Sequence, residues 1–274
     1  MRDNTTVSIA VLSGKGGVGK SNLALNICYA LHQLGNNVLL MDCDMGLANM
    51  DVLLGIAPEK HLQDMLLENQ DPSSILLPIG PHRENRLDLI PANSGMAEFV
   101  ELDAGTRSML RAKLNPLACS YDFLCMDIGA GISATALGFG AMATVRVVVI
   151  TPEPTSLTDS YAMIKVMASR NEVTDFYVLV NQVESSQEAK QTYNRLSAAC
   201  QRFLGFSPLF LGEVRTDRSL IDAVRKQKPL MEVSPHAPAA VDCMNIAHAL
   251  ERLRETLIKE GSLEEPLRPV KITD

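Results

Sequence analysis

The sequence lacks the features that mark several large classes of protein. No apolar run approaches the roughly 20 residues that a transmembrane helix needs. The short apolar stretch near the N-terminus leads directly into a glycine-rich loop, which is unlike a signal peptide. We therefore expect a cytoplasmic protein, and the sequence leaves open whether it also binds the inner face of the cell membrane.

Positive charge and metal-ligand patterns are also scarce. The formal net charge of −7 argues against a surface built mainly for nucleic acid. None of the six cysteines forms a C-x-x-C pair, and the five histidines do not cluster with cysteines as they do in zinc sites. We therefore expect reduced, mostly buried thiols and no zinc site.

What the chain does contain is an alternation of short apolar runs and helical patterns, without an internal repeat or a low-complexity linker. The predicted strands are Val7–Leu12, Val38–Asp42, Leu87–Pro91, Phe123–Asp127, Val145–Thr151, Phe176–Asn181 and Pro208–Gly212. The predicted helices are Lys20–Leu34, Gly105–Leu117, Ser133–Met142, Ser156–Ala168, Gln187–Phe203, Leu220–Lys226 and Ala239–Lys259. The alternation predicts a three-layer α/β fold, in which helices flank both faces of a mostly parallel β-sheet.

The ends and the middle of the chain carry weaker signals. We expect a single domain over residues 1–260 and a flexible tail over residues 261–274, because the tail has two prolines and little apolar content. The segment from Gly46 to about Pro81 has no strong strand signal and is expected to hold short helices, such as His61–Leu67.

A phosphate-binding loop follows the first predicted strand. Residues 14–21, GKGGVGKS, match the pattern G-x-x-x-x-G-K-[ST] of P-loop NTPases and open a predicted helix, as this loop requires. Its backbone N–H groups and the positive end of the helix would bind phosphate. Lys20 should reach the β- and γ-phosphates, and the Ser21 hydroxyl should bind Mg²⁺. The residues expected to hold the nucleotide here are Gly14, Gly16, Gly17, Val18, Gly19, Lys20, Ser21 and Asn22.

The second position of the loop is Lys15, where the general pattern allows any residue. With this lysine the loop resembles the deviant Walker A motif of the MinD/ParA group of P-loop ATPases. The resemblance implies an ATP-dependent homodimer in which Lys15 of each copy reaches the phosphates that the other copy binds. A cation supplied in this way can neutralise charge on the transferring phosphoryl group. We therefore expect a slow, Mg²⁺-dependent ATPase that dimerisation activates.

Acidic side chains end two of the predicted strands. Asp42 and Asp44 lie two residues apart and so point to one side, toward the phosphate loop at the carboxyl edge of the sheet. By the resemblance, Asp44 orients the attacking water and Asp42 supports the Mg²⁺ shell. Asp127 resembles the Walker B aspartate, which would hold Mg²⁺ through water. The resemblance also implies that Asn181 binds the adenine edge. We further expect Asp217 to lie near the base.

Three further stretches resemble the flagellar-number regulators of the FlhG/FleN type. They are DCDMGLANMDVLLG, DIGAGIS and TPEPTSLTDSYAMIKVM, within a resemblance that runs from about Ser8 to Pro229. The resemblance implies regulation of flagellar number or placement through a protein partner, either a flagellar GTPase or a transcription regulator. Many relatives stimulate the GTPase with an N-terminal helix, which a first strand beginning at Val7 does not predict here.

Two other interpretations stay open. A division-site or DNA-partition ATPase would need a surface for membrane or DNA, and the basic run that includes Arg218, Arg225 and Lys226 is more typical of a solvated face. The last predicted helix has a narrow apolar stripe, typical of a helix packed on its domain. A metabolic enzyme, such as an ATP-dependent carboxylase or amidase relative, would need a substrate-site nucleophile that the sequence does not reveal, and an iron–sulfur carrier would need a C-x-x-C motif.

Overall fold

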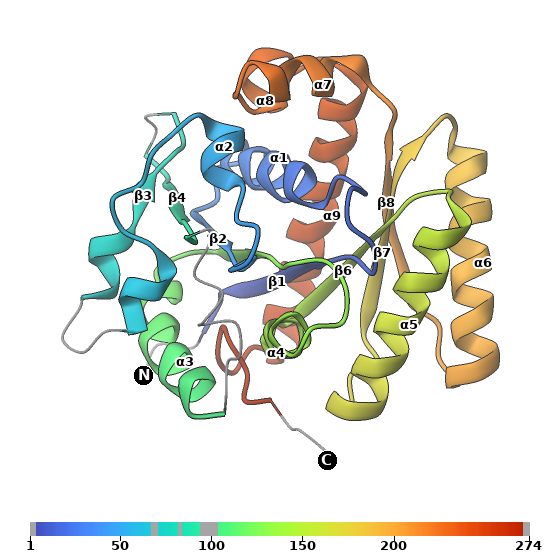
Figure 1. Cartoon of the computed structure of the whole chain (residues 1–274), viewed down its shortest axis with the longest axis horizontal. Coiled ribbons are helices and arrows are strands. Elements are labelled where there is room, and N and C mark those ends of the chain that lie inside the picture. The colour runs from blue at the N-terminus through green and yellow to red at the C-terminus, as the bar shows by residue number, and fades with distance from the viewer. Residues whose placement is uncertain (1–3, 67–70, 82–83, 94–103, 271–274) are drawn as a thin grey trace.

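The computed structural model describes residues 4–66, 71–81, 84–93 and 104–270, and its centre is an eight-stranded sheet (Figure 1). The strands are β1 Val7–Leu12, β2 Val38–Asp42, β3 Leu77–Pro78, β4 Leu87–Ile90, β5 Phe123–Asp127, β6 Val145–Ile150, β7 Phe176–Val183 and β8 Leu209–Arg215. They lie in the order β3-β4-β2-β5-β1-β6-β7-β8. All neighbours are parallel except β3 and β4, so the fold is the mostly parallel α/β sheet that the sequence predicts.

Helices cover both faces of this sheet (Figure 1). They are α1 Lys20–Gln33, α2 Met50–Leu54, η1 Leu62–Leu66, η2 Pro72–Ile75, α3 Ala104–Ala118, α4 Ala134–Met142, α5 Pro154–Asn171, α6 Ser186–Leu204, α7 Arg218–Arg225, α8 Leu230–Val233 and α9 Pro238–Lys259. Side chains of α1, α7, α8 and α9 pack with one face, and those of α3, α4, α5 and α6 pack with the other. Because successive strand residues point to opposite faces, Ile9 joins the first cluster and Ala10 the second. The central strands β1, β2 and β5 are therefore mostly apolar and fully buried.

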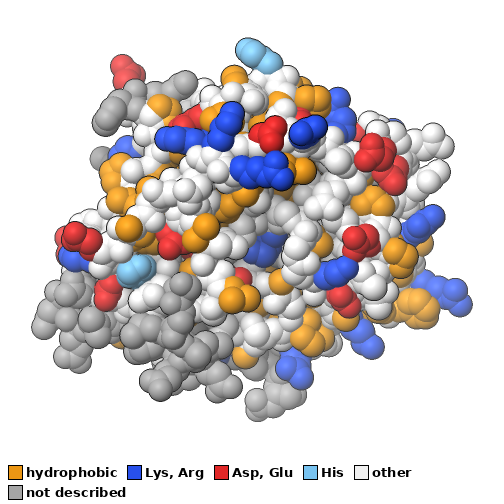
Figure 2. Space-filling model, turned by 45° about the horizontal axis from the view of Figure 1, so that its top comes forward, with side chains coloured by type: hydrophobic (Ala, Val, Ile, Leu, Met, Phe, Trp, Pro, Cys, Tyr) orange, Lys and Arg blue, Asp and Glu red, His pale blue; other side chains and the backbone are white. Residues whose placement is uncertain are grey.

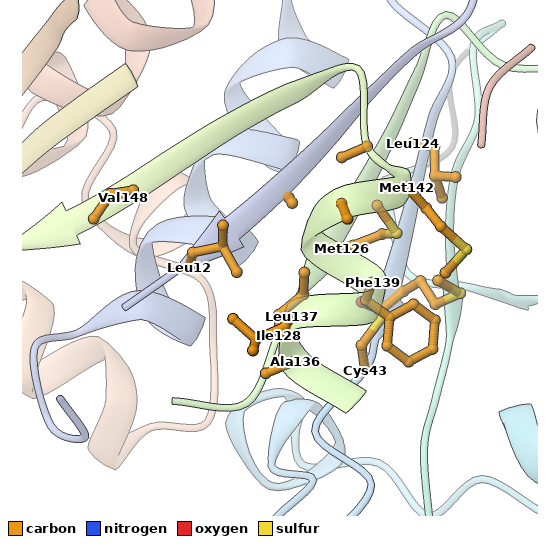
Figure 3. Close-up of a cluster of buried hydrophobic side chains, with 14 of the residues drawn as sticks. Leu12, Cys43, Leu124, Met126, Ile128, Ala136, Leu137, Phe139, Met142 and Val148 are labelled. Atoms are coloured by element: carbon orange, nitrogen blue, oxygen red, sulfur yellow. Dashed lines mark hydrogen bonds between the residues drawn. The ribbon is translucent and has the colours of Figure 1, made fainter. Parts of the chain in front are cut away.

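The core beneath the carboxyl ends of β1 and β5 fixes the elements that surround the site. Figure 3 shows Leu12 of β1 and Met126 of β5 packed with Phe139 and Met142 of α4. Each such side chain contributes about 1.5–3 kcal/mol when it is fully buried. The packing anchors α4, so the loop between β5 and α4 is held at both ends.

The elements whose bounds the sequence does not give are short, with no more than five residues each. The helices α2 and η2 lie in the segment from Gly46 to about Pro81, where short helices are expected, whereas β3 and α8 are not predicted. In place of the predicted helix His61–Leu67 there is the 3₁₀ helix η1, and Leu67 lies outside the described residues.

The segment after α9 differs from the flexible tail that the sequence predicts. Leu267 is fully buried, its backbone N–H donates to Asn115 Oδ1 at 2.9 Å, and Asn115 Nδ2 donates to its carbonyl oxygen at 3.1 Å. The Arg268 N–H donates to the Met142 carbonyl oxygen at 2.8 Å, and Ser8 Oγ donates to that of Pro266. The prediction was wrong up to Val270 because a few apolar side chains and backbone hydrogen bonds hold the segment against α3 and α4. Residues 271–274 lie outside the described part of the chain.

The last long helix, α9, packs on the domain as its apolar stripe predicts. Ile246 and Leu250 are buried, and Leu253 and Leu257 pack against the same cluster. None of the described helices combines the length and the apolar composition needed to span a bilayer.

Candidate nucleotide site

Three adjacent strands, β2, β5 and β1, end at one cleft. Asp42 of β2 and Val11 of β1 both lie beside Asp127 of β5 in the strand register, so their following loops meet at the same edge of the sheet. The cleft has a volume of about 550 Å³. It is lined by the loop after β1, the first turn of α1, the loop after β2 and the start of α4. This is the edge where parallel α/β sheets bind ligands.

The loop after β1 has the shape of an anion-binding turn. Gly19 has a φ of 87°, which glycine adopts without strain, and α1 begins at the next residue. Gly14 lies so close to α5 that a Cβ atom there would be 2.2 Å from the Asp159 carbonyl carbon. Of the predicted phosphate-loop residues, Gly16, Gly17, Gly19, Lys20, Ser21 and Asn22 line the cleft, whereas Gly14 packs on α5 and Val18 is buried. The fold therefore brings the expected loop to the expected cleft.

Lys20 and Asp127 form a buried ion pair at the floor of the cleft. Burial raises the pKa of the Asp127 carboxyl, and the Lys20 ammonium opposes that shift. Asp127 Oδ2 is fully buried and has no hydrogen-bond partner among the described residues. A buried carboxylate oxygen of this kind is costly unless a donor or a cation reaches it. The donor set therefore suits a hydrated divalent cation such as Mg²⁺.

Both carboxylate oxygens of Asp42 accept hydrogen bonds from backbone N–H groups of the segment that follows it. Its Oδ1 accepts from the Asp44 N–H at 3.0 Å, and its Oδ2 accepts from the N–H groups of Asn49 and Met50 at 3.2 and 3.3 Å. Burial, and then the neighbouring Asp127 carboxylate, raise the pKa of Asp42 to about 7. Asp42 thus ties the loop and the start of α2 together, and its predicted role at a metal stays a prediction.

Asp44 lines the cleft and touches the loop after β5. Its Oδ1 accepts from the Leu47 N–H at 3.1 Å, and a Cβ atom on Gly129 would lie 3.1 Å from the same oxygen. The two loops therefore contact each other through this half-buried carboxylate. The arrangement leaves Asp44 facing the space above the phosphate loop.

Lys15 lies outside the cleft lining. Its Nζ donates to Glu153 Oε2 at 2.6 Å and to Thr155 Oγ1 at 2.9 Å, at the N-terminal end of α5. Among the described residues that line the cleft, Lys20 is the only cation. The sequence does not identify Glu153 and Thr155 as partners of Lys15. The signal that could have found them is the carboxylate that follows the β6 run, since β6 lies beside β1 in the sheet.

Asn181 and Asp217, the two predicted base contacts, both form hydrogen bonds with backbone groups of other segments. Asn181 is buried, and its Nδ2 donates to the Val18 carbonyl oxygen of the phosphate loop at 2.8 Å. Asp217 precedes α7 and accepts from the N–H groups of Ser219 and Ala239 at 2.8 and 3.0 Å. Asn181 thus braces the phosphate loop from outside the cleft lining, and both carboxylate oxygens of Asp217 accept hydrogen bonds. Their contacts with a base stay predictions.

Two arginines of the basic run around α7 have acidic partners within the domain. Figure 2 shows Lys and Arg side chains gathered over the end of the molecule that holds α7 and α8, with acidic and apolar side chains between them. Arg215 pairs with Asp242 at 2.7 Å and Arg225 lies 3.7 Å from Asp222. This mixed surface has the composition of a solvated face.

Comparisons with known proteins agree with this geometry. The family model described as the CobQ/CobB/MinD/ParA nucleotide binding domain matches residues 9–230. The antiactivator FleN of Pseudomonas aeruginosa is 35% identical over 256 residues, which are 93% of this chain and 90% of FleN. The flagellum site-determining protein YlxH of Helicobacter pylori is 32% identical, over 97% of this chain and 87% of YlxH.

Solved structures show the same fold. The cell division ATPase MinD of Pyrococcus furiosus has a TM-score of 0.72 and 20% identity, over 90% of this chain and 99% of that one. MinD of Pyrococcus horikoshii, which was solved in complex with Mg-ADP, has a TM-score of 0.72 and 19% identity, over 90% and 97% of the two chains.

Proposed function

Because this chain belongs to the CobQ/CobB/MinD/ParA family of nucleotide-binding domains, we propose that it is an ATP-dependent dimerising switch that regulates flagellar number or placement. The observation that carries the proposal is the cleft itself. A phosphate loop, a buried Lys20–Asp127 pair and Asp44 converge there, while a second lysine, Lys15, lies outside. The names of the relatives FleN and YlxH support the flagellar role.

Phosphate binding is the task of the loop between β1 and α1. Its N–H groups and the N-terminal end of α1 attract the phosphate oxygens of ATP. Lys20 is held at the floor by Asp127 and is therefore positioned before the nucleotide arrives. A preformed site of this kind loses little conformational entropy on binding.

Two side chains would hold Mg²⁺. The Ser21 hydroxyl lies in the first turn of α1, and the unpartnered Oδ2 of Asp127 can accept from water in the shell of the ion. Bound Mg²⁺ would neutralise charge on the phosphates during transfer. Asp42 supports the same region through the loop that it orders.

Asp44 would orient the water that attacks the γ-phosphate. A carboxylate beside phosphates is a weak general base, so positioning is its main contribution. Its contact with Gly129 links the loop after β2 to the loop after β5. Hydrolysis would then alter both loops together, which is a common type of switch.

Lys15 would complete the site of a second copy. In the single chain it pairs with Glu153 and Thr155, so it makes no contribution to its own cleft. In an ATP-bound dimer it would neutralise charge on the partner's nucleotide and so raise the slow rate of hydrolysis. We infer that the dimer acts in the cytoplasm on a flagellar GTPase or a transcription regulator.

Size-exclusion chromatography with Mg-ATP tests the switch. We expect Asp44→Ala to accumulate as a dimer, because ATP persists when the water is not oriented. We expect Lys15→Ala in the same background to stay monomeric while it still binds ATP, as measured by isothermal titration calorimetry. An Asp44→Ala protein that is monomeric at every ATP concentration would contradict the dimer. Flagellar counts in cells that carry Lys15→Ala test the biological role, which an unchanged count would contradict.

A further inference from the structure

Three buried hydroxyl groups gather where helix α5 meets the phosphate loop. They belong to Ser13, Thr151 and Ser160, of which only 1%, 2% and 0% is exposed. None of these hydroxyls has a hydrogen-bond partner among the residues that the structure describes. A buried hydroxyl without a partner costs free energy, and each such group in a folded protein needs an explanation. The contact between α5 and the loop is therefore not fully satisfied in the single chain.

The three hydroxyls lie around one close approach of two backbones. Ser13 directly precedes Gly14, and a Cβ atom on Gly14 would lie 2.3 Å from the Ser160 backbone nitrogen. Thr151 follows β6, which lies beside β1 in the sheet, and its N–H donates to Ser156 Oγ of α5 at 3.0 Å. Because residue 14 has no side chain, nothing separates the loop from α5 at this point, and a movement of one must move the other.

The same end of α5 holds Lys15. This lysine follows Gly14, and its Nζ donates to Glu153 and Thr155 at the start of the helix. In the proposed dimer Lys15 leaves these partners for the nucleotide of the second copy. Its departure releases the start of α5 at the place where the hydroxyls have no partners.

Ser13 connects this contact with the nucleotide cleft. It lines the cleft, and its carbonyl oxygen accepts from the Gly131 N–H of the loop after β5 at 2.9 Å. The loop after β5 also touches Asp44 through Gly129. A change around the phosphates can therefore reach α5 through a residue that contacts both loops.

We propose that α5 is a two-state element, which shifts against the phosphate loop when the ATP-bound dimer forms and so gives the Thr151 and Ser160 hydroxyls partners across the contact. The proposal rests on the proposed function and names the helix that responds to it. Small side chains at a contact let a packed helix slide, and shear of this kind is a common conformational change. The unpaired hydroxyls raise the free energy of the single chain, so pairing them favours the dimer.

Substitutions that remove one hydroxyl and keep the shape of the side chain test the proposal. Thr151→Val should raise the melting temperature of the nucleotide-free protein by about 2–4 °C, because an unpaired buried hydroxyl is removed. In the Asp44→Ala background with Mg-ATP, the same change should weaken the dimer about five- to tenfold, because the hydroxyl is paired there. Ser160→Ala should act in the same two directions. Calorimetry measures the melting, and analytical ultracentrifugation measures the dimer.

Thr144→Val is the matched control. Thr144 precedes β6, whereas Thr151 follows it, so the two residues lie at opposite ends of one strand. Thr144 is also buried, but its hydroxyl has a partner, Ser8 Oγ at 3.2 Å. Thr144→Val should therefore lower the melting temperature and leave the dimer unchanged.

Hydrogen exchange measured by mass spectrometry follows the helix itself. Exchange in the first two turns of α5 should change when Mg-ATP is added to Asp44→Ala, and should stay the same when Lys15→Ala is combined with it. The two-state helix would be overturned by unchanged exchange in α5, by a Thr151→Val protein that melts lower as Thr144→Val does, or by one that dimerises as tightly as its parent. An Asp44→Ala protein that forms no ATP-dependent dimer would instead overturn the proposed function.

Discussion

Asp42 is the residue whose protonation should set the stability of the nucleotide-free protein. Its pKa is raised on folding from 3.8 to about 7 by burial and by the Asp127 carboxylate. Between these pH values the folded protein holds a proton that the unfolded chain has lost. The free energy of unfolding should therefore fall as the pH rises from about 4 to about 7, by up to about 4 kcal/mol.

Urea unfolding between pH 5 and 8 checks this dependence. We expect Asp42→Asn to flatten the slope, because the titrating group is gone, while Asp127 keeps part of it. Asp217→Asn is the control: its folded pKa is lowered, so its contribution is lost only as the pH falls below this range. Equal slopes in wild type and Asp42→Asn would show that Asp42 does not titrate as its surroundings imply.

At the scale of the elements, sequence reasoning succeeded where a run of residues carried its own signal. β1, β2 and β5 appear with the predicted bounds, because unbroken apolar runs are typical of strands buried on both faces. The phosphate loop was found because its residues are consecutive. The bounds of the short elements were not predicted because distant contacts form them: α2 begins where Asp42 accepts its N–H groups, and β3 exists only as a pair with β4. The Lys15–Glu153 contact joins residues 138 positions apart and depends on the strand order.

The C-terminal segment gives a prediction at this scale. Leu267→Ala should destabilise the protein by about 2–4 kcal/mol, because it leaves a cavity between α3 and α4. Pro269→Ala, at an exposed position of the same segment, should change stability by less than about 0.5 kcal/mol. Chemical denaturation of both variants measures the difference. If the two variants are equally stable, the segment does not dock on the core.

At the scale of the whole molecule, the proposed active site needs a lysine from a second copy of the chain. Within the described part of the chain, Lys20 is the one cation that lines the cleft, and the second loop lysine, Lys15, is bound to Glu153 and Thr155. That contact must open before Lys15 can reach another copy. Dimerisation is therefore opposed by a small intramolecular contact and favoured by the charge of the bound phosphates.

Glu153→Gln should shift this balance toward the dimer. The ion pair lies at the surface, with 37% and 60% of the two side chains exposed, so its loss should tighten the ATP-bound dimer only by about two- to fivefold. Analytical ultracentrifugation in the Asp44→Ala background, with Mg-ATP, measures the dissociation constant. Glu260→Gln, an exposed residue at the end of α9, controls for the change in net charge. A weaker dimer in Glu153→Gln would mean that Glu153 stabilises the assembled state, and Lys15 would then be positioned by this contact rather than restrained by it.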